Sequence, residues 1–204
     1  MDQDQTVPHA PDALLIDVEN SSASDLFMAV IPALQLGNIN DAGFLFYIAK
    51  FRGQLERDSF PPDDQEMDSP AVAFSALSEQ MGHPINQAVC SDPETLKTIL
   101  DRVACWHPKI DDGFQPDWKY THRADPEEAC AKNEAAVAAF LKGMGRLCTL
   151  LNDPEYFRAY QTVLRYNTAA VPCPTQHEFE GAKTFMAEEE QRRNIHGIFY
   201  RPEK

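Results

Sequence analysis

Nine residues from Gly43 to Phe51 form the most apolar stretch of the chain and contain one charge, Lys50. Such a run fits three structures: a strand in a sheet core, a membrane-spanning helix or a buried helix. Buried strands favour β-branched residues, and Ile48 is the only one in this run. A bilayer requires about 20 apolar residues, roughly twice this length. We therefore predict a helix over residues 41–58, about five turns long. Because its first half is apolar all round, we expect other helices to bury it on several sides.

Along the rest of the chain, helix starts are marked by a capping side chain that stands before a proline. The pairs are Ser69-Pro70, Asp92-Pro93, Asp125-Pro126 and Asp153-Pro154. The capping oxygen accepts a hydrogen bond from a free N–H of the first turn, and proline is tolerated there because its missing N–H had no partner. Thr175 and Glu178 have the spacing of a capping box. Local chemistry alone therefore predicts a helix start at each of these places.

Behind these starts, apolar residues recur at intervals of three and four, which places them on one face of each helix. The clearest stripes are Leu96, Ile99, Leu100 and Val103; Val137, Phe140, Leu141 and Met144; and Phe157, Tyr160 and Leu164. An earlier helix is expected to open at Ser24 or Asp25, to be kinked or divided by Pro32, and to end at Gly37. Asn40 is the expected cap of the helix over residues 41–58.

Together these elements predict an all-α fold, a single-domain helical bundle of about seven helices around the buried helix at residues 41–58. The bundle is expected to span residues 21–204, after a flexible polar N-terminus over residues 1–20. Gly143 and Gly145 stand in the middle of the longest apolar stripe, so we interpret them as points of close contact between helices.

Acidic residues outnumber basic residues by 32 to 18, which gives a formal net charge of −14. Nucleic acids and anionic membranes are repelled by this charge, because binding to phosphate requires Lys and Arg. We therefore expect neither as a partner. A basic protein would be attracted, and its association would be faster. The alternative is that the surplus charge serves only solubility.

No targeting signal is evident in the chain. Its acidic, polar beginning lacks the basic and apolar regions of a secretory signal, and no apolar run is long enough to span a membrane. The sequence as written predicts a cytoplasmic protein, or a periplasmic one if an export signal has been trimmed from it. The five cysteines do not decide between these compartments. They include no CxxC pair, which argues against a zinc site, and one or two disulfides stay open.

Catalytic motifs are missing from the sequence. It contains no nucleotide-binding loop, no GxSxG element and no two histidines with the i, i+4 spacing of a metal site. A Cys–His nucleophile pair stays open, since its members need not be neighbours in the sequence. We therefore predict a protein that is not an enzyme, with no catalytic residue, no metal and no cofactor.

Two loops are the candidate surfaces for binding a partner. "SFPPDDQEMDSP" is acidic, and "HPKIDDGFQPDWKYTHRADP" is roughly twenty residues long, a length that is uncommon in compact domains and often functional. Acidic groups steer a basic partner, and aromatic side chains supply binding energy when a partner buries them. The predicted contact residues are Asp63, Asp64, Glu66, Asp68, Trp118 and Tyr120. The alternative is a solvated loop, with the aromatic side chains folded back on the bundle.

Several segments resemble small bacterial immunity proteins, a group encoded with secreted interbacterial effectors that include type VI secretion cargo. The segments are "ALQLGNINDAGFLFYIAKFR", "FPP", "GHPINQAV" and "TLKTILDRVACWHP", within residues 33–150. The resemblance implies a protein that neutralises a cognate toxin by steric occlusion of its active site. The strong acidity suits a basic toxin, such as a nuclease. Two other hypotheses stay open: a small enzyme whose site no motif reveals, and a helical adaptor of a secretion or stress system.

Overall fold

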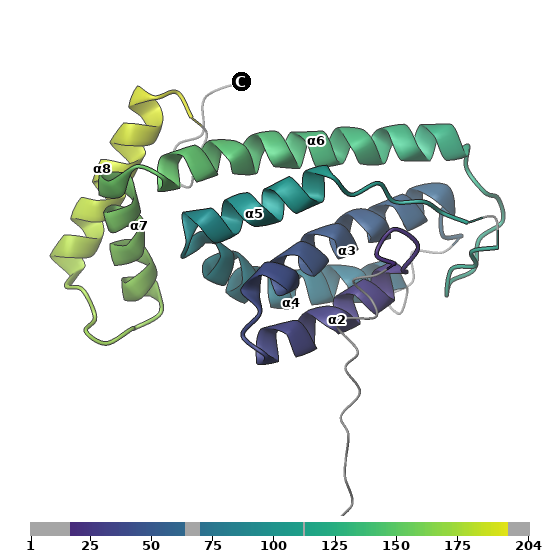
Figure 1. Cartoon of the computed structure of the whole chain (residues 1–204), viewed down its shortest axis with the longest axis horizontal. Helices are drawn as coiled ribbons and strands as arrows, with labels where there is room; N and C mark the ends of the chain where they lie inside the picture. The colour runs from purple at the N-terminus through teal and green to yellow at the C-terminus, as the bar shows by residue number, and fades with distance from the viewer. Residues whose placement is uncertain (1–16, 64–69, 112, 196–204) are drawn as a thin grey trace, which may run out of the picture.

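The structure, a computed structural model, describes residues 17–63, 70–111 and 113–195. These residues contain seven α-helices and no strand. The helices are α2 (Ala23–Gln35), α3 (Ile39–Ser59), α4 (Pro70–Cys90), α5 (Pro93–Ala104), α6 (Pro126–Leu151), α7 (Pro154–Asn167) and α8 (Gln176–Arg192). Figure 1 shows how they pack side by side. The predicted all-α bundle is therefore confirmed.

Helix α3 lies at the centre of the bundle, where α2, α4, α5 and α6 all contact it (Figure 1). Every residue from Ala42 to Ala49 is buried. This enclosure is what an apolar pattern on all sides of a helix predicts. The helix expected over residues 41–58 is confirmed, and it extends slightly beyond both predicted ends.

The closest approach between helices is at Gly43 of α3. A Cβ atom built on Gly43 would lie 2.6 Å from Cδ1 of Ile99 and 2.8 Å from Cγ2 of Val89, so α5 and α4 occupy the space that a side chain would need. The interpretation of Gly143 and Gly145 as close contacts is wrong, because a Cβ on either would meet nothing within 4 Å. Both lie in α6, where Gly143 is exposed and Gly145 is half-buried.

Capping side chains begin most of the helices as the sequence predicts. Asp92, Asp125 and Asp153 each accept a hydrogen bond from a backbone N–H of the first turn of their helix. Thr175 and Glu178 form the predicted capping box of α8. Helix α4 begins at Pro70, and its predicted cap, Ser69, lies outside the described residues.

Two predicted helix starts are displaced by two residues. Helix α2 is capped by Ser22 rather than opening at Ser24 or Asp25, because the Ser22 side chain reaches the Asp25 N–H. Helix α3 is capped by Asn38 rather than by Asn40, since the Asn38 side chain accepts from the N–H of Asp41. In both cases an equally good capping residue stands one half-turn earlier in the chain.

Pro32 does not divide α2, which continues to Gln35 and is followed by Gly37 with a φ of 71°. A proline inside a helix leaves the carbonyl four residues earlier without its helical partner. Here that carbonyl belongs to Met28, whose side chain is 65% exposed on the outer face of α2. Water can therefore reach this side of the helix, and the helix tolerates the proline.

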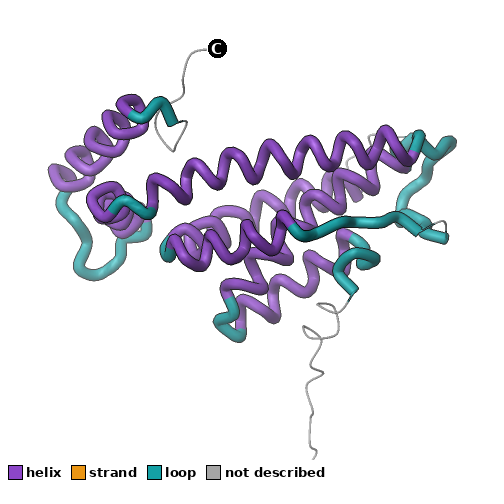
Figure 2. The backbone as a smooth tube through the Cα atoms, turned by 45° about the horizontal axis from the view of Figure 1, so that its top comes forward, coloured by secondary structure: helices purple, strands orange, loops and turns teal. Residues whose placement is uncertain are grey.

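Helices α7 and α8 pack as an antiparallel pair beyond the C-terminal end of α6, away from α2 and α3 (Figures 1 and 2). The Tyr156 hydroxyl on α7 donates a hydrogen bond of 2.5 Å to the carboxylate of Glu190 on α8, and both residues are fully buried. Arg193 forms an ion pair with Asp153, the cap of α7. Helix α6 thus runs the length of the molecule, from the long loop to the α7–α8 pair.

Cys90 and Cys148 are buried, whereas Cys105, Cys130 and Cys173 are exposed, and all five thiols are free. Cys148 is 7% exposed and belongs to the core. Among the described helices, none combines the length and the apolar character needed to cross a membrane.

Candidate functional site

The two loops predicted as separate surfaces meet at one end of the bundle. The Asp63 N–H donates to the carbonyl of Lys119 over 3.1 Å, and the Asp63 carboxylate accepts from the Thr121 N–H over 2.6 Å. Asp63 and Thr121 stand 58 residues apart in the chain. We call residues 61–63 and 113–128 the loop face. Asp64, Glu66 and Asp68 lie outside the described residues.

Both predicted aromatic contact residues turn towards Phe60, which follows α3. The Trp118 indole N–H donates a hydrogen bond of 2.7 Å to the Phe60 carbonyl. The Tyr120 ring packs edge-on against the Phe60 ring at 5.0 Å, and its hydroxyl donates to Gln115 over 3.1 Å. Both side chains are half-buried. This geometry matches aromatic residues folded back on the bundle, and their contact with a partner stays a prediction.

A buried ion pair on α3 holds the start of the long loop. Arg52 and Glu56 are 1% and 2% exposed, and Nε of Arg52 lies 2.8 Å from Oε1 of Glu56. Arg52 also donates to the carbonyls of Glu19, over 3.2 Å, and of Lys109. The Ala23 N–H donates to Glu56 over 2.9 Å. Two charges removed from water are tolerated because their hydrogen-bonding capacity is used.

The charge on Glu56 is opposed by its surroundings. Burial raises the pKa of the Glu56 carboxyl above its ordinary value, although the hydrogen bonds from Arg52 and from the Ala23 N–H act in the opposite direction. Glu19, whose carbonyl Arg52 binds, falls within the N-terminus predicted to be flexible, so part of that segment is hydrogen-bonded to the bundle. Sequence reasoning missed this pair, for which the signal was an i, i+4 Arg–Glu spacing directly after the apolar run of the same helix.

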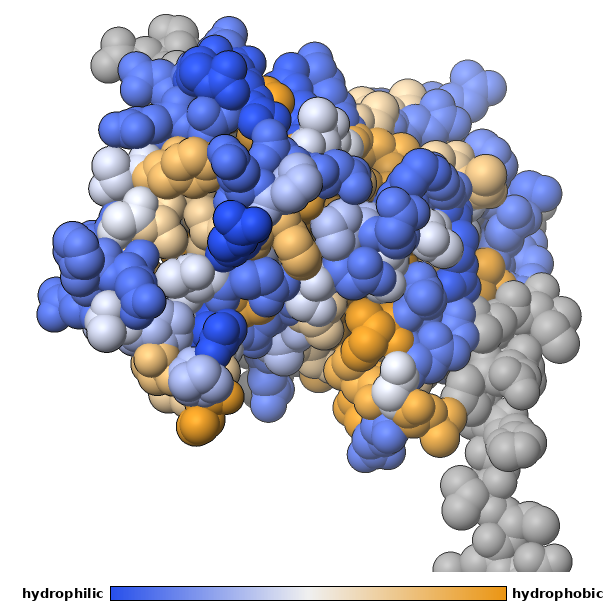
Figure 3. Space-filling view, turned by 60° about the vertical axis from the view of Figure 1, so that its left-hand side comes forward, coloured by the Kyte–Doolittle hydropathy of each residue, from blue (hydrophilic) through white to orange (hydrophobic). Residues whose placement is uncertain are grey.

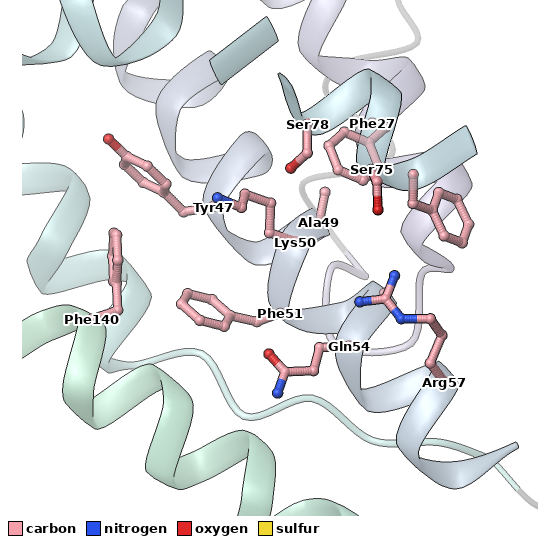
Figure 4. Close-up of a pocket in the computed structure, with 12 residues that line it drawn as sticks. Phe27, Tyr47, Ala49, Lys50, Phe51, Gln54, Arg57, Ser75, Ser78 and Phe140 are labelled. Carbon is pink, nitrogen blue, oxygen red and sulfur yellow. The ribbon is translucent and has the colours of Figure 1, made fainter. Parts of the chain in front are cut away.

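A second surface feature is a groove of about 390 Å³ beside α3, lined by residues of α2, α3, α4 and α6 (Figure 4). We call it the aromatic groove. Two sets of rings line it: Phe51 and Tyr47 pack on Phe140 at 5.3 and 4.8 Å, and Phe27 stacks on Phe74 at 6.1 Å. The sequence analysis did not find it, because its residues come from four separate helices.

Two cations and no carboxylate are present among the described residues that line the aromatic groove. Lys50 and Arg57 both come from α3, and within the described residues neither forms an ion pair. The Lys50 ammonium lies 5.5 Å from the centre of the Phe46 ring. Burial lowers the pKa of Lys50. The groove is thus a local positive region on a protein of net charge −14.

A cavity of about 420 Å³ lies between α3, α6 and the start of the long loop. Cys130, His107 and Glu134 line it together with the apolar side chains of Trp106 and Val137. Cys130 and His107 are both exposed, and no hydrogen bond joins them. In the described part of the chain, no three His, Cys, Asp or Glu side chains are placed to hold a metal ion.

Cys90 shows how burial suppresses reactivity in the core. Burial raises the pKa of its thiol to about 11, so the thiol keeps its proton at neutral pH. The thiolate is the nucleophilic form of cysteine. Cys90 is therefore a structural residue, next to Tyr160, whose pKa is also raised by burial.

Comparisons of the chain with protein-family models, with curated proteins and with solved structures found no match. The function is therefore argued from the surfaces themselves.

Proposed function

We propose that this protein is an immunity-type inhibitor, which binds a cognate toxin through the loop face and covers the toxin's active site. The observation that carries the proposal is the pairing of Asp63 with Lys119 and Thr121. This pairing joins the acidic loop and the aromatic loop into a single surface. An inhibitor that works by steric occlusion needs a surface of this kind, broad and already in place before the partner arrives.

The charge of the loop face suits a basic toxin. Asp63, Asp117, Asp125, Glu127 and Glu128 are all exposed on it. Exposed carboxylates of this kind raise the rate at which a positively charged partner associates, and salt reduces this gain. The resemblance to immunity proteins adds the biological setting, in which toxin and inhibitor are encoded side by side.

The loop face is held in place before binding. Trp118 is bonded to Phe60, the Ala124 N–H donates to the Ser59 carbonyl over 2.9 Å, and Arg52 holds the Lys109 carbonyl from the core. A loop that is already ordered loses less conformational entropy when a partner binds, so more of the interaction energy remains as affinity. This rigidity fits an inhibitor that must bind its toxin tightly.

The test begins with the product of the neighbouring gene. If that product is the toxin, co-expression with this protein should restore growth, and the two chains should purify as a stoichiometric complex. Failure of both results would remove the proposal.

A matched pair of variants then locates the surface. Asp63→Asn, Asp117→Asn and Glu127→Gln neutralise the loop face, and asparagine at position 63 still accepts the Thr121 N–H. We expect association to be about tenfold slower at low salt, because local steering is lost. The control carries Glu79→Gln, Glu155→Gln and Glu188→Gln, three exposed carboxylates elsewhere on the protein. Equal slowing by both variants would show that net charge alone acts and that the loop face is not the contact.

A further inference from the structure

We propose that the aromatic groove is a binding site for an amphiphilic carboxylate, a free small molecule with a flat apolar body and one anionic group. No part of this site belongs to the loop face, so the proposal stands apart from toxin binding. Its basis is the combination of aromatic rings with two cations of α3 that form no ion pair with any of the described residues.

The apolar part of the groove is open to a ligand. Five aromatic side chains line it from four helices, and the groove measures about 390 Å³. Small-molecule sites have volumes of roughly 300–1,000 Å³ and are lined mostly by apolar and aromatic groups with a few polar ones. Ser75, Ser78 and Gln54 are the polar neutral residues of this lining. A flat ring system fits this composition because aromatic rings stack on or pack edge-on against one another.

The charges select the sign of the ligand. The chain has 32 acidic and 18 basic residues, yet the described lining of the groove carries Lys50 and Arg57 and no carboxylate. Figure 4 shows the Lys50 side chain directed towards Tyr47 and Ser78, and the Arg57 guanidinium on the opposite side of the groove, below Ser75. The two residues are seven positions apart on α3, a rise of about 10 Å. An anionic group can therefore pair with a cation at either end while its apolar body lies on the rings.

Lys50 gives a second reason to expect an anion. Although Lys50 is partly exposed to solvent, burial of the rest of its side chain lowers the pKa of its ammonium, and no carboxylate in the described residues forms an ion pair with it. A partly desolvated cation gains more from a new anionic partner than a fully hydrated one does. Arg57 adds a planar guanidinium, which binds a carboxylate with two parallel hydrogen bonds.

Three other hollows on the described part of the chain are each lined by a glutamate, whereas the aromatic groove is lined by none. Figure 3, which brings the α7–α8 end forward, shows a mostly hydrophilic surface with hydrophobic side chains in small separate patches. The largest exposed apolar side chains, such as Leu36 at 75% and Val171 at 96%, stand outside the groove lining. The aromatic groove is thus distinguished by its hollow shape together with its positive charge.

The experiment compares two probes of similar shape and opposite charge, 2-naphthylacetate and 2-(2-naphthyl)ethylamine, by titration calorimetry with the full chain. We expect saturable binding of the carboxylate and no binding of the amine. Amide chemical shifts in the NMR spectrum should change on α3, α4 and α6 around the groove. The proposal is overturned if the carboxylate does not bind up to millimolar concentration, if the amine binds equally well, or if the shifts change elsewhere.

Single substitutions then test the two cations. Lys50→Met and Arg57→Met remove the charge and keep most of the side-chain length, and each should weaken binding of 2-naphthylacetate by about fivefold to tenfold. The control is Lys142→Met, which removes an exposed cation of α6 that does not line the groove. It should leave the affinity unchanged. Equal affinity in all three variants would show that the carboxylate is not held by Lys50 or Arg57.

Discussion

The two halves of α3 are buried by different kinds of interaction. From Ala42 to Ala49 the buried residues are all apolar or aromatic, apart from the hydroxyl of Tyr47, and they face neighbouring helices. From Arg52 to Ser59 the buried residues include a guanidinium, a carboxylate and a hydroxyl. Helices present apolar side chains to α3, whereas loops present backbone N–H and C=O groups that need hydrogen-bond partners. The second half of the helix is polar because loops cover it.

This difference decides where function can be built. The loop face is bonded to the end of α3 through Ser59 and Phe60, and the long loop that leads into it is bonded to Arg52. Lys50 and Arg57 of the same helix line the aromatic groove. The first half of α3 thus packs against helices, the second half anchors the loop face, and the aromatic groove is lined by residues of both halves.

The largest effect is expected from Arg52→Met in the polar half. The change leaves Glu56 buried without its ion-pair partner and leaves the Lys109 carbonyl without the Arg52 donor, whereas the Glu19 carbonyl keeps its hydrogen bond from the Lys109 N–H. Breaking one side of a buried pair typically destabilises a protein by about 3–5 kcal/mol. Urea denaturation measures the loss. The double variant Arg52→Met, Glu56→Leu should recover part of it, because no buried charge is then left unpaired.

An exposed pair of the same spacing is the control for Arg52. Lys97 and Asp101 are an i, i+4 pair with side chains 60% and 66% exposed. Lys97→Met should leave the unfolding midpoint almost unchanged, because water solvates an exposed carboxylate. A similar loss of unfolding free energy in Arg52→Met and Lys97→Met would show that burial does not make the Arg52–Glu56 pair more important than an exposed pair.

In the apolar half, one added methyl group should be the disruptive change. Gly43→Ala places a Cβ 2.6 Å from Ile99 Cδ1 and 2.8 Å from Val89 Cγ2, so these buried side chains must shift, at a cost of about 1–3 kcal/mol. Gly143→Ala, in open space on α6, should instead stabilise the protein by about 0.5–1 kcal/mol, because glycine is a poor helix former. Thermal unfolding of both variants checks the two signs. Equal effects of the same sign would show that the packing around Gly43 is looser than described.

A smaller effect is expected from pH, through Cys90 beside the apolar half. Its pKa is raised from 9.0 to about 11 by burial, so the folded protein holds the thiol proton more tightly than the unfolded chain does. This contribution to stability is therefore fully present below pH 9 and is lost as the pH rises from about 9 to about 11, by at most about 3 kcal/mol. Urea denaturation at increasing pH measures the slope.

Cys90→Ala should flatten this slope, whatever it does to the stability at neutral pH. The buried Tyr47 and Tyr160, whose pKa values are also raised by burial, contribute in the same direction at higher pH and remain in the variant. Cys105→Ala, which removes an exposed thiol, should leave the slope as it is. An unchanged slope in Cys90→Ala would show that this thiol is not protected in the folded protein.

The helices could be predicted from the sequence because their signals are local. A cap such as Asp92 acts within one turn, and a stripe such as Leu96 to Val103 is visible within one segment. Where two capping residues stand close together, as at Asn38 and Asn40, local signals do not choose between them. Whether a glycine marks a close contact depends on the helices packed against it, as Val89 and Ile99 pack against Gly43. The sequence of one helix does not show this, and the interpretation of Gly143 and Gly145 was therefore wrong.

The candidate surfaces could be predicted only in part. Composition and loop length identified Asp63, Trp118 and Tyr120, but nothing in the sequence showed that a carboxylate at position 63 would meet an amide at position 121. The aromatic groove needs Phe27, Phe74 and Phe140 to converge from three helices besides α3. Periodicity placed Phe140 on the apolar face of a helix, and Phe27 and Phe74 were not singled out. The spacing of apolar residues does not tell which core positions line a groove.

Hydrogen–deuterium exchange of this protein, with and without the product of the neighbouring gene, tests the proposed function most directly. We expect slower exchange of backbone amides in residues 61–63 and 113–128 when the toxin is bound, with α7 and α8 unchanged. Protection confined to α7 and α8, or no protection anywhere on the chain, would contradict it.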